Sequence, residues 1–245
     1  MNKGTARKII IVVFWLALWQ VLSVLVNNKI LLAGPYEALL ALIRLGATSD
    51  FWMSVLMTVL KITAGFMIGL ILGIVCACLS YSLRLFREFI TPPVSVIKSI
   101  PVASFVILVI IWAGASSLSV VISALVVFPM IYLNVLAGLD STDVKLIETG
   151  RLFRFRNLDK ARHIYLPSVA PHLTSAVSIS SGMAFKSGIA AEVIGRPLQS
   201  LGAGIYLSKI SLMTDDLFAW TFCAVILSYL FEKVMSYVIG RLLSR

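Results

Sequence analysis

Long apolar runs alternate with short polar connections along the whole chain. A membrane-spanning helix needs about 20 mainly apolar residues. Six runs meet this requirement, at about residues 9–26, 55–79, 94–113, 118–139, 169–194 and 217–240. The pattern predicts an all-α, polytopic membrane protein with about six transmembrane helices, in which residues 1–245 form a single transmembrane domain.

The segments around these runs carry weaker signals. A basic start followed by an apolar run also fits a signal peptide. The run at 9–26 is long, however, and Asn27-Asn28-Lys29 offers no small-residue cleavage site, so we expect a retained helix. Residues 35–46 predict a short interfacial helix. Residues 196–216 contain Pro197 and two glycines, which predict an irregular external segment.

The composition supports the membrane interpretation. Hydrophobic residues make up 60% of the chain and charged residues 13%, whereas soluble domains are about 45–50% apolar and about 25% charged. The net charge of +10 would suggest nucleic acid as a partner of a soluble protein. In a membrane protein, basic cytoplasmic loops explain the same charge, so no nucleic-acid partner is expected.

The distribution of basic residues predicts the orientation, because cytoplasmic loops are enriched in Lys and Arg. One set of ends holds thirteen: Lys3, Arg7, Lys8, Arg84, Arg87, Lys145, Arg151, Arg154, Arg156, Lys160, Arg162, Arg241 and Arg245. The opposite set holds four: Lys29, Arg44, Arg196 and Lys209. Both termini are therefore expected in the cytoplasm.

A row of small residues predicts a close helix–helix contact. Gly65, Gly69 and Gly73 recur every four residues, and Ala77 continues the row. This spacing places them on one helix face, where missing side chains let another backbone approach. The row indicates packing and carries no specific functional signal.

Residues 140–167 form the longest polar segment on the cytoplasmic side. Asp140, Ser141 and Thr142 offer N-cap chemistry for a first short helix, and Asn157 offers it for a second. The segment predicts a helix–turn–helix elbow at the membrane surface. The alternative is a basic loop that only fixes topology. Such a loop needs no capped helices with an embedded carboxylate, which favours a docking surface for a cytoplasmic partner.

The elbow resembles the EAA loop of ABC importer permeases, which reads E-A-A, a glycine six positions after the Glu, then I-x-L-P. The matching positions are Glu148-Thr149-Gly150, Arg154, and Ile164-Tyr165-Leu166-Pro167. Thr149 and Gly150 replace two alanines, and Arg154 replaces the elbow glycine. A left-handed residue other than glycine costs about 1 kcal/mol or more. We therefore expect the bend to shift, with Gly150 as the nearby flexible point.

Other segments extend the resemblance in the same order along the chain. Residues 31–35 with Glu37 resemble the family's entry segment. Ser99-Ile100-Pro101 and Ile111-Trp112-Ala113-Gly114 resemble the R-x-I-P…L-W-F-G stretch of the nitrate/sulfonate/taurine-type branch. Ala191-Glu192 and Leu201-Gly202 resemble its A-E…G-L-G element. Together these segments cover most of residues 31–215.

The resemblance implies a type I ABC importer permease in the bacterial cytoplasmic membrane. It implies two ATP-binding cassette ATPase subunits, an extracytoplasmic solute-binding protein and, in this branch, a second copy of the chain. It further implies that the elbow sits in a groove of the ATPase, with Glu148 facing a basic residue there. The solute stays open among sulfonates, taurine, nitrate, vitamins and vitamin precursors.

Catalytic chemistry has few candidates in this sequence. No G-x-x-x-x-G-K-[ST] phosphate loop occurs, so ATP and Mg²⁺ are expected on the partner ATPase and no cofactor on this chain. Cys76, Cys78 and Cys223 form no metal or disulfide pattern, and His163 and His172 have no ligand at metal-binding spacing. No catalytic residue and no metal site is predicted.

The run at 169–194 is rich in small polar residues. Ser175, Ser178, Gly182 and Lys186 share one helix face, which predicts that they line the translocation path. Alternatively, the serines satisfy neighbouring helices and Lys186 snorkels outward or pairs with Glu192.

Two further residues are weaker candidates for the translocation path. Pro101, inside a predicted helix, removes a backbone donor and could mark a gate. Trp112 is a candidate because it belongs to the family-like stretch.

Two other function classes compete with the importer, and a third possibility is a permease-like subunit retained only for assembly or sensing, which only a transport assay separates. A secondary transporter or channel would need coupling-ion sites and commonly has internal repeats, of which the sequence gives no clear sign. A membrane-embedded enzyme would need a nucleophile–base pair or a metal cluster. The sequence favours the permease subunit of an ATP-driven importer over both.

Overall fold

A computed structural model describes residues 3–28 and 30–243, and these residues form helices joined by short connections, with no strand among them. The first six helices are α1 (Lys3–Val26), α2 (Pro35–Gly46), α3 (Ser49–Ser82), α4 (Arg84–Ser99), α5 (Val102–Ala113) and α6 (Leu118–Asp140). The rest are α7 (Val144–Leu152), α8 (Asn157–Lys160), α9 (Leu166–Gly195), α10 (Leu201–Ile210) and α11 (Thr214–Leu243). Lys29 and Arg245, two of the loop charges, lie outside the described residues.

Four helical segments of the described chain are long and apolar enough to cross a membrane: Ile9–Val26, Ser49–Ser82, Ala115–Asp140 and Thr214–Leu243. The pair α4 and α5 makes a fifth if it counts as one bent span. Helix α9 has 30 residues, about 45 Å at 1.5 Å per residue, but its polar side chains lower its hydropathy. The predicted six spans therefore require both the bent pair and α9.

The predicted third span is broken, so the expectation of one continuous helix over 94–113 is wrong. Helix α4 starts ten residues earlier, at Arg84, and ends at Ser99, and the axis of α5 is bent from it by 105°. Ile100 and Pro101 are extended, with ψ of 133° each. The ring of a proline clashes with a helical conformation of the residue before it, which is Ile100 here. Pro101 therefore separates two helices and does not kink one.

The segments at the opposite end are more regular than expected. The interfacial helix predicted at 35–46 is confirmed as α2. The segment 196–216, predicted to be irregular, contains α10. The Ser200 hydroxyl caps α10 by accepting a hydrogen bond from the Ala203 N–H at 3.1 Å. Arg44 of α2 forms an ion pair with Asp216 at the start of α11.

Helices α3 and α6 pack with their backbones close together along the glycine row. A Cβ atom at Gly69 would lie 2.8 Å from the Ala124 carbonyl oxygen, and one at Gly73 would lie 2.8 Å from the Ile131 Cβ. Gly65 rests on the Val120 carbonyl in the same way. Contacts this close leave no room for a side chain, so the row fixes the crossing of α3 and α6.

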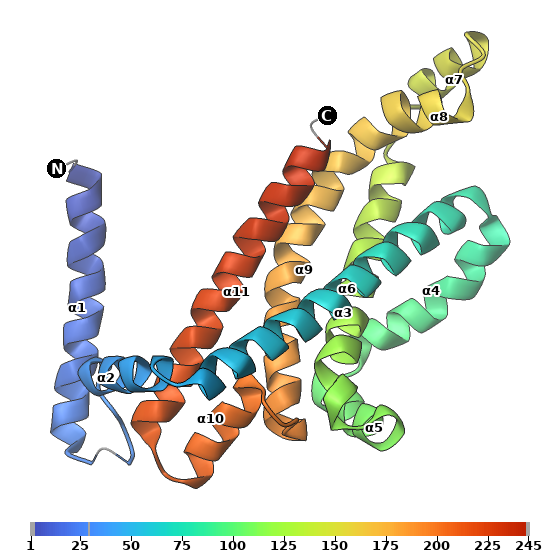
Figure 1. The fold of residues 1–245 in the computed structure, drawn as a ribbon. Coiled ribbons are helices and arrows are strands. Elements are labelled where there is room, and N and C mark those ends of the chain that lie inside the picture. The colour runs from blue at the N-terminus through green and yellow to red at the C-terminus, as the bar shows by residue number, and fades with distance from the viewer. Residues whose placement is uncertain (1–2, 29, 244–245) are drawn as a thin grey trace.

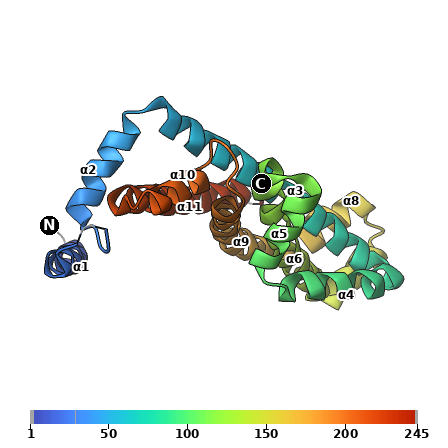
Figure 2. The same ribbon diagram turned by 90° about the horizontal axis from the view of Figure 1, so that it is seen from below.

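Helix α9 lies beside both α6 and α11, while α1 stands at one edge of the molecule (Figures 1 and 2). The Trp19 ring of α1 packs on Phe218 of α11, with ring centroids 5.1 Å apart. The start of α1, the end of α11 and the pair α7–α8 lie at one end, which we call the elbow end (Figure 1). Helices α5 and α10 lie at the opposite end.

Candidate functional site

The elbow begins with a capped helix. The Asp143 Oδ1 atom accepts a hydrogen bond from the Lys145 N–H at 2.9 Å, so Asp143 is the N-cap of α7. The prediction that Asp140, Ser141 and Thr142 supply this cap is wrong. Helix α6 runs to Asp140, and the hydroxyls of the other two donate back to the Gly138 carbonyl of α6. They therefore close the preceding helix.

The bend of the elbow lies at Arg154. Arg154 has a left-handed φ of 51°, its N–H donates to the Arg151 carbonyl at 3.1 Å, and the Phe155 N–H donates to the Gly150 carbonyl at 2.9 Å. These two bonds and the left-handed residue between them make a Schellman motif, which usually has glycine at the left-handed position. The expectation that the bend moves toward Gly150 is therefore wrong.

Gly150 serves packing inside the elbow. It lies buried within α7, and a Cβ atom there would lie 2.7 Å from the Ile164 Cδ1. Ile164 is itself only 5% exposed. The two arms of the elbow are therefore held together by the Ile164 side chain seated on Gly150.

The second arm of the elbow is an extension of α9. Helix α8 continues through a π-helical turn, Ala161–Tyr165, directly into α9. The N-cap position of α8 is Arg156, which makes no side-chain cap bond, so the prediction of an Asn157 cap is wrong. Leu166 and Pro167 lie exposed in the first turn of α9. Because α8, the π-helical turn and α9 form one continuous helical path, a displacement of α7 that the contact of Ile164 with Gly150 passes to this arm is carried on to α9.

The elbow projects beyond the helix bundle (Figure 1), and many of its apolar side chains are exposed. Its exposed large apolar side chains include Val144, Leu146, Leu152, Phe153 and Leu158. Glu148 and Thr149 are exposed on the same short helix, and no hydrogen bond or ion pair to the described residues holds the Glu148 carboxylate. Exposed apolar patches of this kind mark interaction sites.

A buried carboxylate joins four helices near the opposite end. Glu192 of α9 is fully buried and accepts hydrogen bonds from the Ser119 hydroxyl at 2.6 Å, the Thr58 hydroxyl at 2.9 Å and the Gly202 N–H at 3.2 Å. The Leu201 N–H donates to the Thr58 oxygen at 2.9 Å. The network therefore ties α3, α6 and α9 to the start of α10.

The bonds of Glu192 connect two family-like segments and rule out the suggested pairing of Lys186 with Glu192. The sequence names Ala191-Glu192 and Leu201-Gly202 as family-like, and the structure shows that Glu192 and Gly202 are bonded to each other. The suggested pairing of Lys186 with Glu192 is wrong, because Lys186 is exposed and Glu192 is occupied by the three donors.

Two residues of the predicted polar face, Gly182 and Lys186, line a cavity between α9 and α11, and a third, Ser178, bonds to a carboxylate of its lining. The cavity measures about 390 Å³ and is lined by Gly182, Lys186 and Glu232, among others. Ser178 donates a hydrogen bond to Glu232 at 3.2 Å. Ser175 is exposed outside this cavity. Sequence reasoning missed Glu232, although a lone carboxylate in an apolar run is a visible signal.

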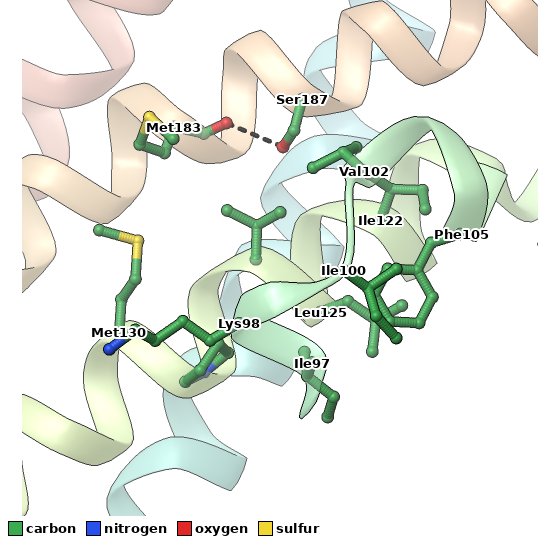
Figure 3. Close-up of a pocket in the computed structure, with 12 residues that line it drawn as sticks. Ile97, Lys98, Ile100, Val102, Phe105, Ile122, Leu125, Met130, Met183 and Ser187 are labelled. Atoms are coloured by element: carbon green, nitrogen blue, oxygen red, sulfur yellow. Dashed lines mark hydrogen bonds between the residues drawn. The ribbon is translucent and has the colours of Figure 1, made fainter. Parts of the chain in front are cut away.

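A second cavity of about 240 Å³ lies at the break between α4 and α5. Figure 3 shows Lys98, Ile100 and Val102 at the break facing Met183 and Ser187 of α9. Ser187 donates to the Met183 carbonyl at 2.8 Å.

The sequence-predicted residues near this second cavity fall outside its lining. Pro101 lies between two lining residues, and Trp112 of α5 is 77% exposed. Lys98 was missed, although it takes the place of the basic residue in the R-x-I-P pattern.

Comparison with protein families identifies the family of this chain. Residues 69–245 match the family described as the binding-protein-dependent transport system inner membrane component. This match covers well over half of the chain, and the chain belongs to that family. It is therefore a membrane-embedded transport subunit, and in this family ATP hydrolysis belongs to separate subunits.

Curated relatives place the chain within a branch of the family. It is 24% identical to the aliphatic sulfonates transport permease SsuC of Bacillus subtilis over 74% of this chain and 66% of that protein, just under two thirds of its length. It is 20% identical to the nitrate import permease NrtB of Synechococcus elongatus, over 84% of each chain. These relatives confirm the predicted resemblance to the nitrate/sulfonate/taurine-type branch.

Solved structures confirm the fold. The chain is similar to a membrane chain of the MetNI methionine ABC transporter in an inward-facing conformation, with a TM-score of 0.60 and 21% identity over 79% of this chain and 94% of that one. An amino acid ABC transporter gives a TM-score of 0.55 at 19% identity, over 77% and 88% of the two chains. The predicted all-α permease fold is thus confirmed.

Proposed function

We propose that this chain forms the translocation path of an ATP-driven importer and that the elbow is its mechanical handle. The observation that carries the proposal is the construction of the elbow. Its capped helix α7 is exposed, Ile164 locks it onto the second arm, and that arm runs without interruption into α9. A force applied to α7 therefore reaches the centre of the bundle.

The partners follow from this proposal. Two ATPase subunits bind at the elbow end and hold the ATP and Mg²⁺, with Glu148 facing a basic residue of the ATPase. A second copy of this chain completes the path, and a solute-binding protein docks at the opposite end. The thirteen basic residues that the sequence gathers in one set of ends and loops support cytoplasmic termini. ATP drives transport only through its differential affinity for the two conformations of the complex.

The transported solute is proposed to be a small anion. The residues assigned to the path are Ser175, Ser178, Gly182, Lys186, Pro101 and Trp112. Lys186 faces the cavity between α9 and α11, and Lys98 faces the cavity at the α4–α5 break. Among the relatives, SsuC and NrtB are described as permeases for aliphatic sulfonates and nitrate. Both descriptions agree with a lysine in each cavity, and the cavity at the α4–α5 break has no carboxylate in its lining, whereas Glu232 lines the other.

A reconstituted system tests this function. The chain is co-purified with its ATPase and binding protein, placed in proteoliposomes and supplied with radiolabelled methanesulfonate, taurine or nitrate. Uptake of one of these compounds that requires ATP supports the proposal. The same uptake in vesicles without the ATPase would instead indicate a secondary transporter or channel.

A further inference from the structure

Helix α4 carries all its hydrophilic side chains on one side. At about 100° per residue, these side chains fall within an arc of about 120°. They are Arg84, Arg87, Glu88, Thr91, Ser95, Lys98 and Ser99, which we call the polar face of α4. Leu85, Phe89 and Val96 lie outside this arc and are exposed, whereas Val94, also outside it, is buried in the bundle.

The hydroxyls of the polar face follow one another along the helix. Thr91 donates to the Arg87 carbonyl at 2.6 Å, Ser95 to the Thr91 carbonyl at 3.0 Å, and Ser99 to the Ser95 carbonyl at 2.8 Å. All three side chains are exposed in the single chain. These bonds satisfy the hydroxyl protons within the helix, but charged side chains are costly in lipid. Because Arg84, Arg87, Glu88 and Lys98 lie exposed on the same face, the face meets water or another polar surface.

Two of the cations on this face are paired and one is not. Arg84 contacts Glu88 at 3.0 Å, and Arg87 forms two bonds to Asp140 at the end of α6, at 2.7 and 3.2 Å. Within the described chain, Lys98 has no hydrogen bond or ion pair. The unbalanced positive charge of the face therefore lies at its inner end, next to the break before Pro101.

The polar face lines a cavity that leads to that break. A cavity of about 350 Å³ between α4 and α6 is lined by Arg87, Thr91, Ser95, Lys98 and Ser99, together with residues of α6 such as Tyr132. Lys98 also lines the 240 Å³ cavity between the break, α6 and α9. One lysine is thus shared by two cavities that follow each other from the centre of the bundle to the elbow end.

We propose that the polar face of α4 is the cytoplasmic half of the translocation path and that it conducts a small oxyanion such as a sulfonate or carboxylate. Lys98 holds the anion at the break, and the hydroxyls of Ser95 and Thr91 rotate to donate to it. Arg87 receives it at the exit in competition with Asp140. Asp140 closes α6 just before the elbow, so movement of the elbow can release Arg87. The proposal rests on the function proposed above and specifies its route and solute class.

Thiol labelling tests the route without knowledge of the solute. Cys76, Cys78 and Cys223 are replaced by alanine, and Ser95→Cys is introduced in the complex with the ATPase. Rates are measured for an anionic methanethiosulfonate (ethylsulfonate) and a cationic one (trimethylammonium), each relative to its rate with 2-mercaptoethanol. The matched control is Val96→Cys, the next residue along the helix, which is 55% exposed on the apolar side.

Position 95 is expected to favour the anionic reagent by about tenfold or more, because a cleft of one charge concentrates counter-ions. Lys98→Gln should remove most of this preference, and Val96→Cys should react with neither reagent. The proposal is overturned if position 95 stays inert with and without ATP, or if Lys98→Gln leaves its preference unchanged. Should Ser95→Cys prevent folding, Thr91→Cys provides the same measurement.

The outcomes separate this route from the proposed function. ATP-dependent uptake with an inert or unselective position 95 would reject the route alone. An anion-selective position 95 in a chain that neither binds an ATPase nor requires ATP for uptake would reject the importer function while leaving the polar route in place.

Discussion

The Ser119 hydroxyl of α6 donates a hydrogen bond of 2.6 Å to the fully buried carboxylate of Glu192 on α9, across 73 positions of sequence. Thr58 of α3 donates to the same carboxylate. Three long helices are therefore fastened together near the end opposite the elbow. Helix α9 is bonded to α3 and α6 at this end and continues into the elbow at the other. A movement of the elbow is therefore expected to tilt α9 about the end held by Glu192.

Removal of the Glu192 carboxylate should destabilise the bundle. Glu192→Ala leaves the Thr58 and Ser119 hydroxyls and the Gly202 N–H without their acceptor, at a cost of about 1–3 kcal/mol for each buried group left unsatisfied. We expect a clear loss of monodisperse protein after heating in detergent, with Glu192→Gln intermediate. The control is Glu88→Gln, an exposed partner of Arg84. Equal behaviour of Glu192→Ala and this control would show that the network does not stabilise the fold.

The glycine row should tolerate no side chain. Gly69→Val places a Cβ atom 2.8 Å from the Ala124 carbonyl oxygen and forces α3 away from α6. We expect this variant to yield little folded protein. Gly240→Ala is the matched control, because nothing lies within 4 Å of its added methyl group and alanine favours a helix by about 0.5–1 kcal/mol. Normal yield and thermal stability of Gly69→Val would contradict the close contact.

A glycine at the elbow bend should stabilise the chain. Arg154→Gly relieves a left-handed residue and should raise stability by about 1 kcal/mol, seen as a higher thermal midpoint in detergent. Arg156→Gly is the control, because Arg156 has an ordinary φ of −62° and glycine only adds freedom there. A midpoint of Arg154→Gly at or below that of the Arg156 variant would argue against a strained bend.

Loss of the Lys186 charge should weaken anion uptake. Lys186→Met keeps an unbranched side chain only one atom shorter but removes the cation that faces the cavity between α9 and α11. We expect a reduced rate of uptake in proteoliposomes with little change in basal ATPase activity. Lys209→Met, at an exposed position of α10 outside the lining of that cavity, is the control. Unchanged uptake and unchanged solute preference in Lys186→Met would remove this residue from the path.

Apolar run length predicted most long helices, because burial in lipid dominates those segments. It failed at residues 84–99, where the polar face of α4 interrupts the apolar count and Pro92-Pro93 suggest a loop. It also failed at α10, where Gly202 and Gly204 suggest irregular chain. Gly204 is required because a Cβ atom there would lie 2.5 Å from the Trp220 ring. Such an approach between distant segments is tertiary and leaves no periodic signal.

The elbow was located by its sequence pattern, but its geometry was not. The pattern places Glu148, Ile164 and Pro167 in register, whereas the strained residue Arg154 stays left-handed because the Schellman bonds and the contact of Ile164 with Gly150 determine the bend together. Lys98 and Glu232 were missed for a similar reason. Lys98 lines a cavity that α4 encloses with α9, a helix far along the chain. Glu232 of α11 lines a different cavity, which α11 encloses with α9.

Crosslinking from position 148 tests most directly whether the elbow is driven by an ATPase. Glu148→Cys is placed in the cysteine-free chain, co-expressed with its ATPase, and treated with a short thiol-to-amine crosslinker in the absence and presence of ATP. We predict a crosslinked product with the ATPase whose yield changes with nucleotide. An exposed, reactive position 148 that never reaches the ATPase in either state would contradict the account.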